Sequence, residues 1–174
     1  MEYSLKLPLD KATRESLRAG DTVRLTGVVY TARDAAHKRI AEALEAGKEP
    51  PFPLDNAAVY YCGPTPAREG EVIGSCGPTT SARMDAYTPA LTDAGVTVAI
   101  GKGKRSAQVV DAMRRNSAVY FAAVGGAAAI IKNAVKECNC VAYPDLGCEA
   151  VYRLYVCDLD VIVAIDCKGN TILR

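Results

Sequence analysis

The feature that most constrains the fold is a regular alternation of strand-like and helix-like segments through the middle of the chain. Short apolar runs rich in β-branched residues alternate with amphipathic segments, whose apolar residues recur every three or four positions. This pattern predicts strands at 21–32, 57–63, 96–104 and 117–124, and helices at 33–47, 106–116 and 125–137. Such alternation is typical of a largely parallel sheet with helices on its faces.

The last part of the chain follows a different pattern. Residues 150–173 predict two or three strands, with a hairpin turn at Lys168-Gly169-Asn170. We therefore expect a mixed α/β fold in which part of the sheet is a separate antiparallel layer or a barrel, with the strand order left open. A length of 174 residues without an interdomain linker, repeat or low-complexity tract predicts one domain, residues 1–174.

The stretch GSCGPTTSARMD, residues 74–85, combines a turn with the start of a helix. Gly77-Pro78 predicts a tight turn, and Thr79 or Thr80 is the natural N-cap of the helix that follows. Hydroxyls and unpaired N–H groups at such an end bind carboxylates or phosphates, and Arg83 can reach the same anion. An ordinary capped helix whose arginine lies in water is the alternative.

Two further turns carry cations after predicted strands. In TARDAAHKR (31–39), Arg33 falls in the first helical turn, where its charge opposes the helix dipole unless an anion lies beside it. His37 lies four residues further on the same side. In IGKGKRS (100–106), flanking glycines leave the ammonium of Lys102 accessible, although the phosphate-binding P-loop pattern is not met. The alternative for Arg33 is a surface ion pair. The alternatives for His37 and Lys102 are a structural histidine and a solvated turn.

These three turns are expected to converge, because the carboxyl ends of parallel strands meet at one edge of a sheet. Arg33, Arg83 and Lys102 would then hold one small polyanion, with Thr79 among them. A net charge of +1 provides no broad attraction for nucleic acid or an acidic membrane, so any anion must be bound locally. No nucleophile–base pair is evident, and four carboxylates lack an obvious partner: Asp85, Asp145, Glu149 and Asp166. The chain therefore predicts part of an active site.

Cysteine usage bears on cofactor and compartment. Seven cysteines, an odd number without a secretory signal, predict reduced thiols in the cytoplasm. Cys138 and Cys140 form a C-x-C pair, but no second pair stands at zinc-ligand spacing and the chain has one histidine, so we expect no metal held by this chain alone. No apolar run approaches the roughly 18 residues of a membrane span.

Five segments carry a family resemblance. In order they are ARDAAHKR (32–39), GSCGPTTSARMD (74–85), AIGKGK (99–104), AVGGAAAIIKNAVK (123–136) and AYPDLGCEAVYRLYVCDLDVIVAIDCKGN (142–170). They resemble the β subunit of the iron–sulfur hydro-lyases, the class I fumarase and L(+)-tartrate dehydratase family. The resemblance extends over about residues 20–174 and implies a swivelling β/β/α domain, with a mixed sheet or barrel-like core flanked by helices.

The resemblance also implies a chemistry. In this family a [4Fe–4S] cluster, held by cysteines of an α subunit, acts as a Lewis acid in the reversible addition of water to a dicarboxylate alkene. The β subunit closes the site. Thr79 is implied as the general base for the C3 proton, Arg33, Arg83 and Lys102 as carboxylate-binding residues, and His37 as a residue that helps nearby.

Three functions stay open at this point. The first is the β subunit of a fumarate hydratase that interconverts fumarate and L-malate with its α partner. The second is the β subunit of an L(+)-tartrate dehydratase, which shares the motifs. The third is a stand-alone anion-binding module without catalysis. An isolated β chain is expected to expose the apolar face meant for its partner, and hence to form a homodimer or a higher assembly.

Overall fold

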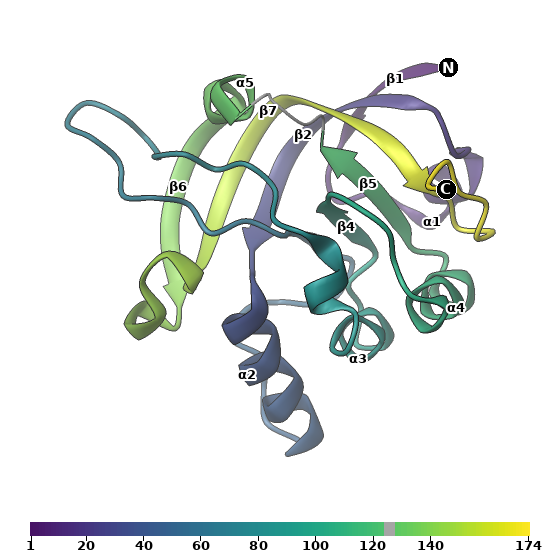
Figure 1. The fold of residues 1–174 in the computed structure, drawn as a ribbon, viewed down its shortest axis with the longest axis horizontal. Coiled ribbons are helices and arrows are strands. Elements are labelled where there is room, and N and C mark those ends of the chain that lie inside the picture. The colour runs from purple at the N-terminus through teal and green to yellow at the C-terminus, as the bar shows by residue number, and fades with distance from the viewer. Residues whose placement is uncertain (124–127) are drawn as a thin grey trace.

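The sheet closes on itself. In a computed structural model that describes residues 1–123 and 128–174, seven strands lie in the order β1-β2-β3-β4-β5-β7-β6, and β2 also pairs with β7 (Figure 1). Strands β2, β3, β4, β5 and β7 thus form a ring, to which β1 and β6 are added. The strands are β1 (Glu2–Lys6), β2 (Thr22–Thr31), β3 (Ala58–Tyr60), β4 (Val98–Gly101), β5 (Val119–Ala123), β6 (Val135–Ala142) and β7 (Val151–Ile165).

Strand β7 is the element that closes the ring. Strands β1 to β5 run parallel to one another, whereas β7 is antiparallel to β2, β5 and β6. With 15 residues, β7 is long enough to pair with β2 from Arg153 to Ile162 and with β5 from Val161 to Ile165. The predicted mixed fold with a barrel-like core is confirmed.

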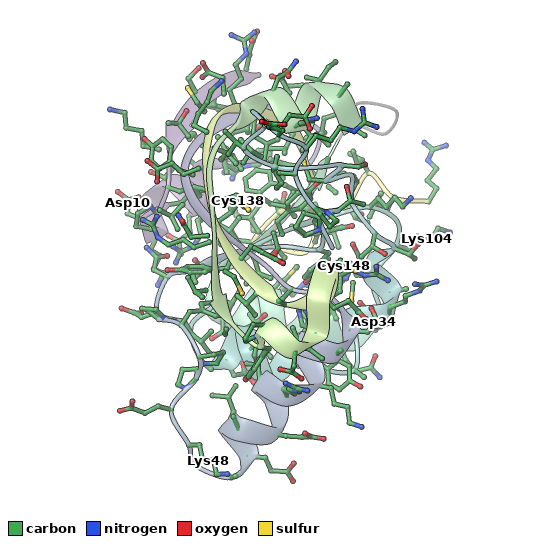
Figure 2. All side chains as sticks on the ribbon, turned by 90° about the vertical axis from the view of Figure 1, so that its left-hand side faces the viewer. Asp10, Asp34, Lys48, Lys104, Cys138 and Cys148 are labelled. Atoms are coloured by element: carbon green, nitrogen blue, oxygen red, sulfur yellow. The ribbon has the colours of Figure 1, made fainter. Side chains whose placement is uncertain are left out.

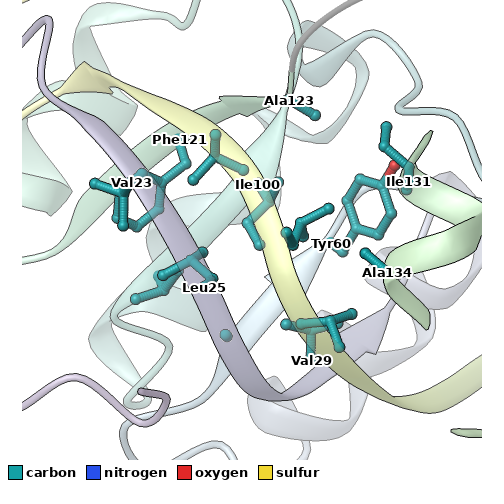
Figure 3. Close-up of a cluster of buried hydrophobic side chains, with 14 of the residues drawn as sticks. Val23, Leu25, Val29, Tyr60, Ile100, Phe121, Ala123, Ile131 and Ala134 are labelled. Carbon is teal, nitrogen blue, oxygen red and sulfur yellow. The ribbon is translucent and has the colours of Figure 1, made fainter. Parts of the chain in front are cut away.

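Side chains on the central parallel strands β3 and β4 are buried on both faces. In β3, Ala58 and Tyr60 belong to the cluster inside the barrel, whereas Val59 packs outward. This follows from the period of two in a strand, and strands buried on both sides read as continuous apolar runs. The inner cluster includes Val23, Leu25, Val29, Ile100 and Phe121 (Figure 3).

The outer face of the parallel strands is covered by helices. Three of them, α2, α3 and α4, lie together along one side of the barrel, and α2 and α4 contribute Ile40, Val109 and Met113 to the outer cluster (Figure 1). The helices are α1 (Lys11–Ser16), α2 (Asp34–Glu45), η1 (Ser81–Met84), α3 (Thr88–Asp93), α4 (Ala107–Asn116), α5 (Ala128–Ala134) and η2 (Pro144–Glu149). In the described parts of the chain, no helix is both long and apolar enough to cross a membrane.

Two expectations for the C-terminal third need correction. The predicted helix 125–137 ends at Ala134, because residues from Val135 onward pair with β7 and form β6, a strand that the sequence pattern did not indicate. The predicted two or three strands after residue 150 are one long strand, β7, followed by the expected turn. In that turn, the Asp166 carboxylate accepts hydrogen bonds from the N–H groups of Lys168 and Asn170. The predictions for residues 124–127 lie outside the described residues.

Candidate active site

Three of the predicted site segments follow neighbouring parallel strands at one rim of the barrel. Strands β2, β3 and β4 are consecutive in the sheet and end at Thr31, Tyr60 and Gly101. Arg33 therefore follows the end of β2 and Lys102 follows the end of β4, on either side of β3. The backbone of these segments therefore lies at one edge of the sheet, as expected.

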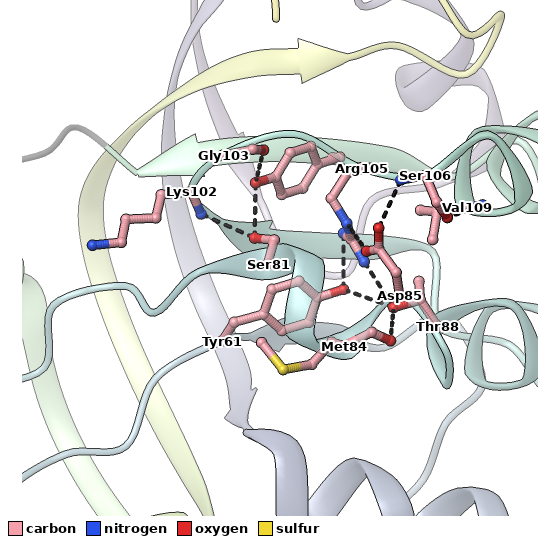
Figure 4. A network of polar contacts seen from close by, with 11 residues as sticks. Tyr61, Ser81, Met84, Asp85, Thr88, Lys102, Gly103, Arg105, Ser106 and Val109 are labelled. Atoms are coloured by element: carbon pink, nitrogen blue, oxygen red, sulfur yellow. Dashed lines mark hydrogen bonds and ion pairs between the residues drawn. The ribbon is translucent and has the colours of Figure 1, made fainter.

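The stretch with Thr79 is attached to this rim by backbone hydrogen bonds. The Thr79 N–H donates to the Tyr61 carbonyl at 2.8 Å, and the Ser81 N–H donates to the Lys102 carbonyl at 2.9 Å. Thr80 and Lys102 form an isolated parallel bridge, and the Lys102 N–H donates to the Ser81 Oγ at 3.0 Å (Figure 4). The stretch thus lies against the ends of both β3 and β4.

Gly101 is what allows this close approach. A Cβ atom at position 101 would lie 2.7 Å from Cδ2 of Tyr61 and would overlap the Oγ of Ser81. Real Cβ atoms do not come so close to other heavy atoms, so any larger residue would separate the strand from Ser81. The absence of a side chain at position 101 therefore keeps Lys102 beside the stretch that carries Thr79.

The expected helical anion cradle is not formed as predicted. The helix that follows Thr80 is a four-residue 3₁₀ helix, η1, and its N-cap Thr80 makes no side-chain capping hydrogen bond. The N–H groups of Thr79 and Ser81 are paired with carbonyl groups of the rim. Anion binding here must therefore depend on side chains, and Arg83 and Lys102 are both exposed. Within the described residues, neither of these two cations has an ion-pair partner.

Arg33 is the N-cap of α2 rather than a residue of its first turn. Its Nε lies 3.8 Å from Oε1 of Glu149, and this buried nitrogen has no hydrogen-bond partner within the described residues. Gly63 makes room for the arginine, because a Cβ there would lie 2.7 Å from the Arg33 Cδ. An ion pair with a glutamate was one alternative for Arg33, and Glu149 is that glutamate. The distance is too long for a hydrogen bond, so the Nε–H remains a donor for an added acceptor.

His37 lies beneath the rim and is 1% exposed. Its Nδ1 is 2.9 Å from the Arg33 carbonyl, and the imidazole ring meets the Tyr61 ring edge-on, with centroids 5.3 Å apart. Because a carbonyl only accepts, Nδ1 carries the proton in this contact. Burial lowers the pKa of His37 from 6.5 to about 4, so the imidazole is neutral near pH 7. His37 therefore supports the backbone at Arg33 and does not add a charge.

The free energy of unfolding should depend on the protonation of His37. The unfolded chain protonates this residue below pH 6.5, whereas the folded chain resists protonation down to about pH 4. Acidification through this window therefore favours the unfolded state, by about 2 kcal/mol between roughly pH 7 and pH 5. Replacing His37 with glutamine should flatten the slope between these pH values in urea unfolding. A slope equal to that of the unmodified chain would contradict the assignment.

The four carboxylates without an evident partner all have one in the structure. Asp85 accepts from Arg105 at 2.7 Å, and Asp145 forms a bidentate pair with Arg39 whose hydrogen bonds lower the pKa of Asp145. Glu149 faces Arg33, and Asp166 caps the turn after β7. None of the four is left as an unpaired general base. Arg105 and Tyr61, which sequence reasoning missed, make the buried contacts of this region.

The cysteines do not form a ligand set. Across residues 1–123 and 128–174, no group of three or more His, Cys, Asp or Glu side chains is arranged to hold a metal ion. Burial raises the pKa of the Cys62 thiol and raises that of Cys76 to about 11, so both are protonated near pH 7. Cys138 on β6 and Cys148 in η2, both labelled in Figure 2, are less buried. They line a common cavity of about 300 Å³. The described residues therefore do not fit an iron–sulfur cluster as its ligands.

The fold and this rim define a class: a mixed α/β barrel that presents lysine and arginine side chains at the carboxyl ends of its parallel strands. The sequence matches the family described as Fumarase C-terminus over residues 2–174. The chain belongs to this family.

Relatives of known name agree with that membership. "Fumarate hydratase 2" of Leishmania major is 37% identical over 98% of this chain and 31% of its own length. "Fumarate hydratase class I, anaerobic" of Escherichia coli is 36% identical over 96% of this chain and 32% of its own length. "Putative L(+)-tartrate dehydratase subunit beta" of Methanocaldococcus jannaschii is 38% identical over 99% of this chain and 91% of its own length. The chain thus spans about a third of the two fumarate hydratases but nearly all of the β subunit.

Proposed function

We propose that this chain is the β subunit of an iron–sulfur hydro-lyase that interconverts fumarate and L-malate together with an α subunit carrying the [4Fe–4S] cluster. The family membership and the hydratase and dehydratase names of the relatives support a hydro-lyase. The coverage of only about a third of the fumarate hydratases supports the need for further polypeptide. The observation that carries the proposal is the bridge between Thr80 and Lys102, which holds Thr79 and Lys102 on adjacent segments of one rim.

The residues of this chain are assigned to the proton-transfer half of the reaction. Dehydration of malate requires loss of a proton from the carbon beside a carboxylate, which places a second negative charge on that carboxylate. Arg33, Arg83 and Lys102 would bind the carboxylates, and fixed cations stabilise this charged state more than the ground state. Thr79 would accept the proton. His37, neutral and buried, would hold Arg33 in place by donating a hydrogen bond to the Arg33 carbonyl.

An L(+)-tartrate dehydratase is the second candidate. It is favoured by one observation, which is that the relative named as a tartrate dehydratase β subunit matches this chain over 91% of its own length. Tartrate and malate share two carboxylates and a hydroxyl group, so the same cations would bind either. The assignment to malate or tartrate therefore depends on measured turnover.

We further propose that residues 1–174 act as one domain, in the cytoplasm, and self-associate when isolated. The seven cysteines are free, as expected of a reducing compartment. Support for self-association comes from large apolar side chains that are exposed in the chain alone: Val72, Ile130, Val141 and Tyr155.

Reconstitution tests the function and the substrate together. The chain is mixed anaerobically with a cluster-loaded α subunit, and the dehydration of malate and of tartrate is followed separately. We expect turnover of malate by the pair and none by either subunit alone. Preferential turnover of tartrate would select the second candidate. A cluster-loaded pair that dehydrates neither acid would contradict a hydro-lyase and favour an anion-binding module.

A further inference from the structure

A fully buried guanidinium lies behind the rim. The side chain of Arg105 is 0% exposed and donates three hydrogen bonds, to Asp85 at 2.7 Å, to the Tyr61 hydroxyl at 3.1 Å and to Thr88 at 2.7 Å (Figure 4). Its Cζ also lies 5.0 Å from the ring centroid of Tyr61 and 4.9 Å from that of Tyr120. Such a set of contacts uses the planar fork of arginine, which lysine does not provide.

Each partner of Arg105 leads to a segment of the candidate site. Tyr61 follows β3, and its carbonyl accepts from the Thr79 N–H. Asp85 directly follows η1, the short helix that contains Arg83. Arg105 itself lies three residues after Lys102. One cation therefore joins the end of β3, the stretch with Thr79 and Arg83, and the turn with Lys102.

A second chain of hydrogen bonds runs along the same contact. The Tyr120 hydroxyl donates to the Gly103 carbonyl at 3.0 Å, so the Ser81 hydroxyl, 2.8 Å away, donates to Tyr120. Ser81 in turn accepts from the Lys102 N–H. This series of hydrogen bonds connects the turn with Lys102 to the stretch with Thr79, on the side that faces Arg105.

The contacts of Arg105 favour its charged form. Burial acts to lower the pKa of Arg105, but Tyr61 and Asp85 more than offset it, and its pKa lies above the ordinary value. Asp85 also accepts from the Ser106 N–H at 2.6 Å, so both of its oxygens are bonded. The Arg105 guanidinium therefore keeps its charge near neutral pH.

We propose that Arg105 is a positioning residue that fixes the Thr79 stretch and the Lys102 turn relative to one another through Asp85, Tyr61 and Thr88. Its effect on catalysis rests on the proposed function. In that reaction, a displacement of about 1 Å between the base and a binding group is enough to lower the rate by up to about 10²-fold. Arg105 does not itself need to touch the substrate. All residues of the cross-link belong to this chain.

The test uses Arg105→Lys, which keeps the charge and removes the fork. Amide hydrogen exchange is measured by NMR on the whole chain, together with kcat and KM of the assembled enzyme. We expect exchange to accelerate about 10-fold or more at the amides of Thr79, Ser81 and Lys102, with the β2–β7 ladder unchanged. We expect kcat to fall about 10-fold while KM changes little, because binding groups remain present but are less well placed.

Two further variants make the test decisive. Asp85→Asn keeps the shape of the pair and should accelerate exchange at the same three amides, so a misfolded Arg105→Lys chain does not remove the test. Arg115→Lys is the control, because it makes the same substitution in an exposed bidentate pair with Asp93, where Arg115 Nε is 2.8 Å from Asp93 Oδ1. It should leave the amide exchange rates and the kinetics unchanged.

The outcomes separate this proposal from the proposed function. Unchanged exchange at the three amides, or equal acceleration throughout the sheet, overturns the positioning role. Local acceleration with an unchanged kcat overturns the catalytic consequence of that role. If the unmodified pair dehydrates neither malate nor tartrate, the hydro-lyase assignment fails, and the exchange pattern alone still decides whether Arg105 fixes the two segments.

Discussion

Replacement of Thr79 with alanine is expected to lower kcat for malate dehydration by about 10²-fold or more, with little change in KM. The substitution removes the hydroxyl that is assigned to accept the proton, whereas Arg83 and Lys102 remain to bind the carboxylates. The backbone should keep its position, because Thr79 is held through its N–H group on the Tyr61 carbonyl. Steady-state kinetics of the reconstituted pair provide the measurement.

Thr80 offers a matched control for this substitution. It is the neighbouring threonine, it is exposed, and its side chain makes no capping hydrogen bond. Thr80→Ala should therefore retain nearly the full kcat. A rise in KM without a loss of kcat in Thr79→Ala would make Thr79 a binding residue, and some other group would have to be the base.

Replacement of Arg83 with alanine is expected to reduce kcat/KM by about 10- to 150-fold, which corresponds to the roughly 1.5–3 kcal/mol of one charged hydrogen bond. The thermal midpoint of unfolding should hardly change, because the arginine side chain is exposed on η1. Arg83→Lys should recover only part of the loss, since lysine keeps the charge without the bidentate fork. Both variants are assayed in the reconstituted pair.

The control for Arg83 is an exposed cation on α2, the helix that begins after Arg33. Lys38 on α2 is exposed and lies 4.0 Å from Glu42, one turn away on the same helix. Lys38→Ala should leave kcat/KM unchanged within about twofold, because such surface pairs contribute little. An Arg83→Ala enzyme with the same kcat/KM as the unmodified pair would exclude Arg83 from the site.

Local sequence signals were sufficient for the parallel half of the fold. The helix predicted at 106–116 is α4, and its N-cap Ser106 accepts from the Val109 N–H. The predicted strand 21–32 is β2, and the predicted helix 33–47 contains α2. Each of these depends on periodicity and capping within about a dozen residues, which are properties that a sequence displays directly.

The contacts that were missed are long-range. Strand β6 exists because it pairs with β7, and no local pattern distinguishes it from a continuation of α5. The sequence pattern placed Arg105 in a basic surface turn. Its burial depends on Tyr61, 44 positions before it, and on Tyr120, 15 positions after it. The amides of Thr79 and Ser81 looked free for an anion, but strand ends far away in sequence bind them. Tertiary partners decided each case.

The closing strand has a consequence for how the chain matures during synthesis. Because β7 is antiparallel to both β2 and β5, the earlier strands present two unpaired edges until residues 151–165 have left the ribosome. Open edges of this kind pair readily with other chains. A nascent chain of this protein is therefore most prone to aggregate while β7 has not yet been made, and chaperone binding would be most useful during that interval.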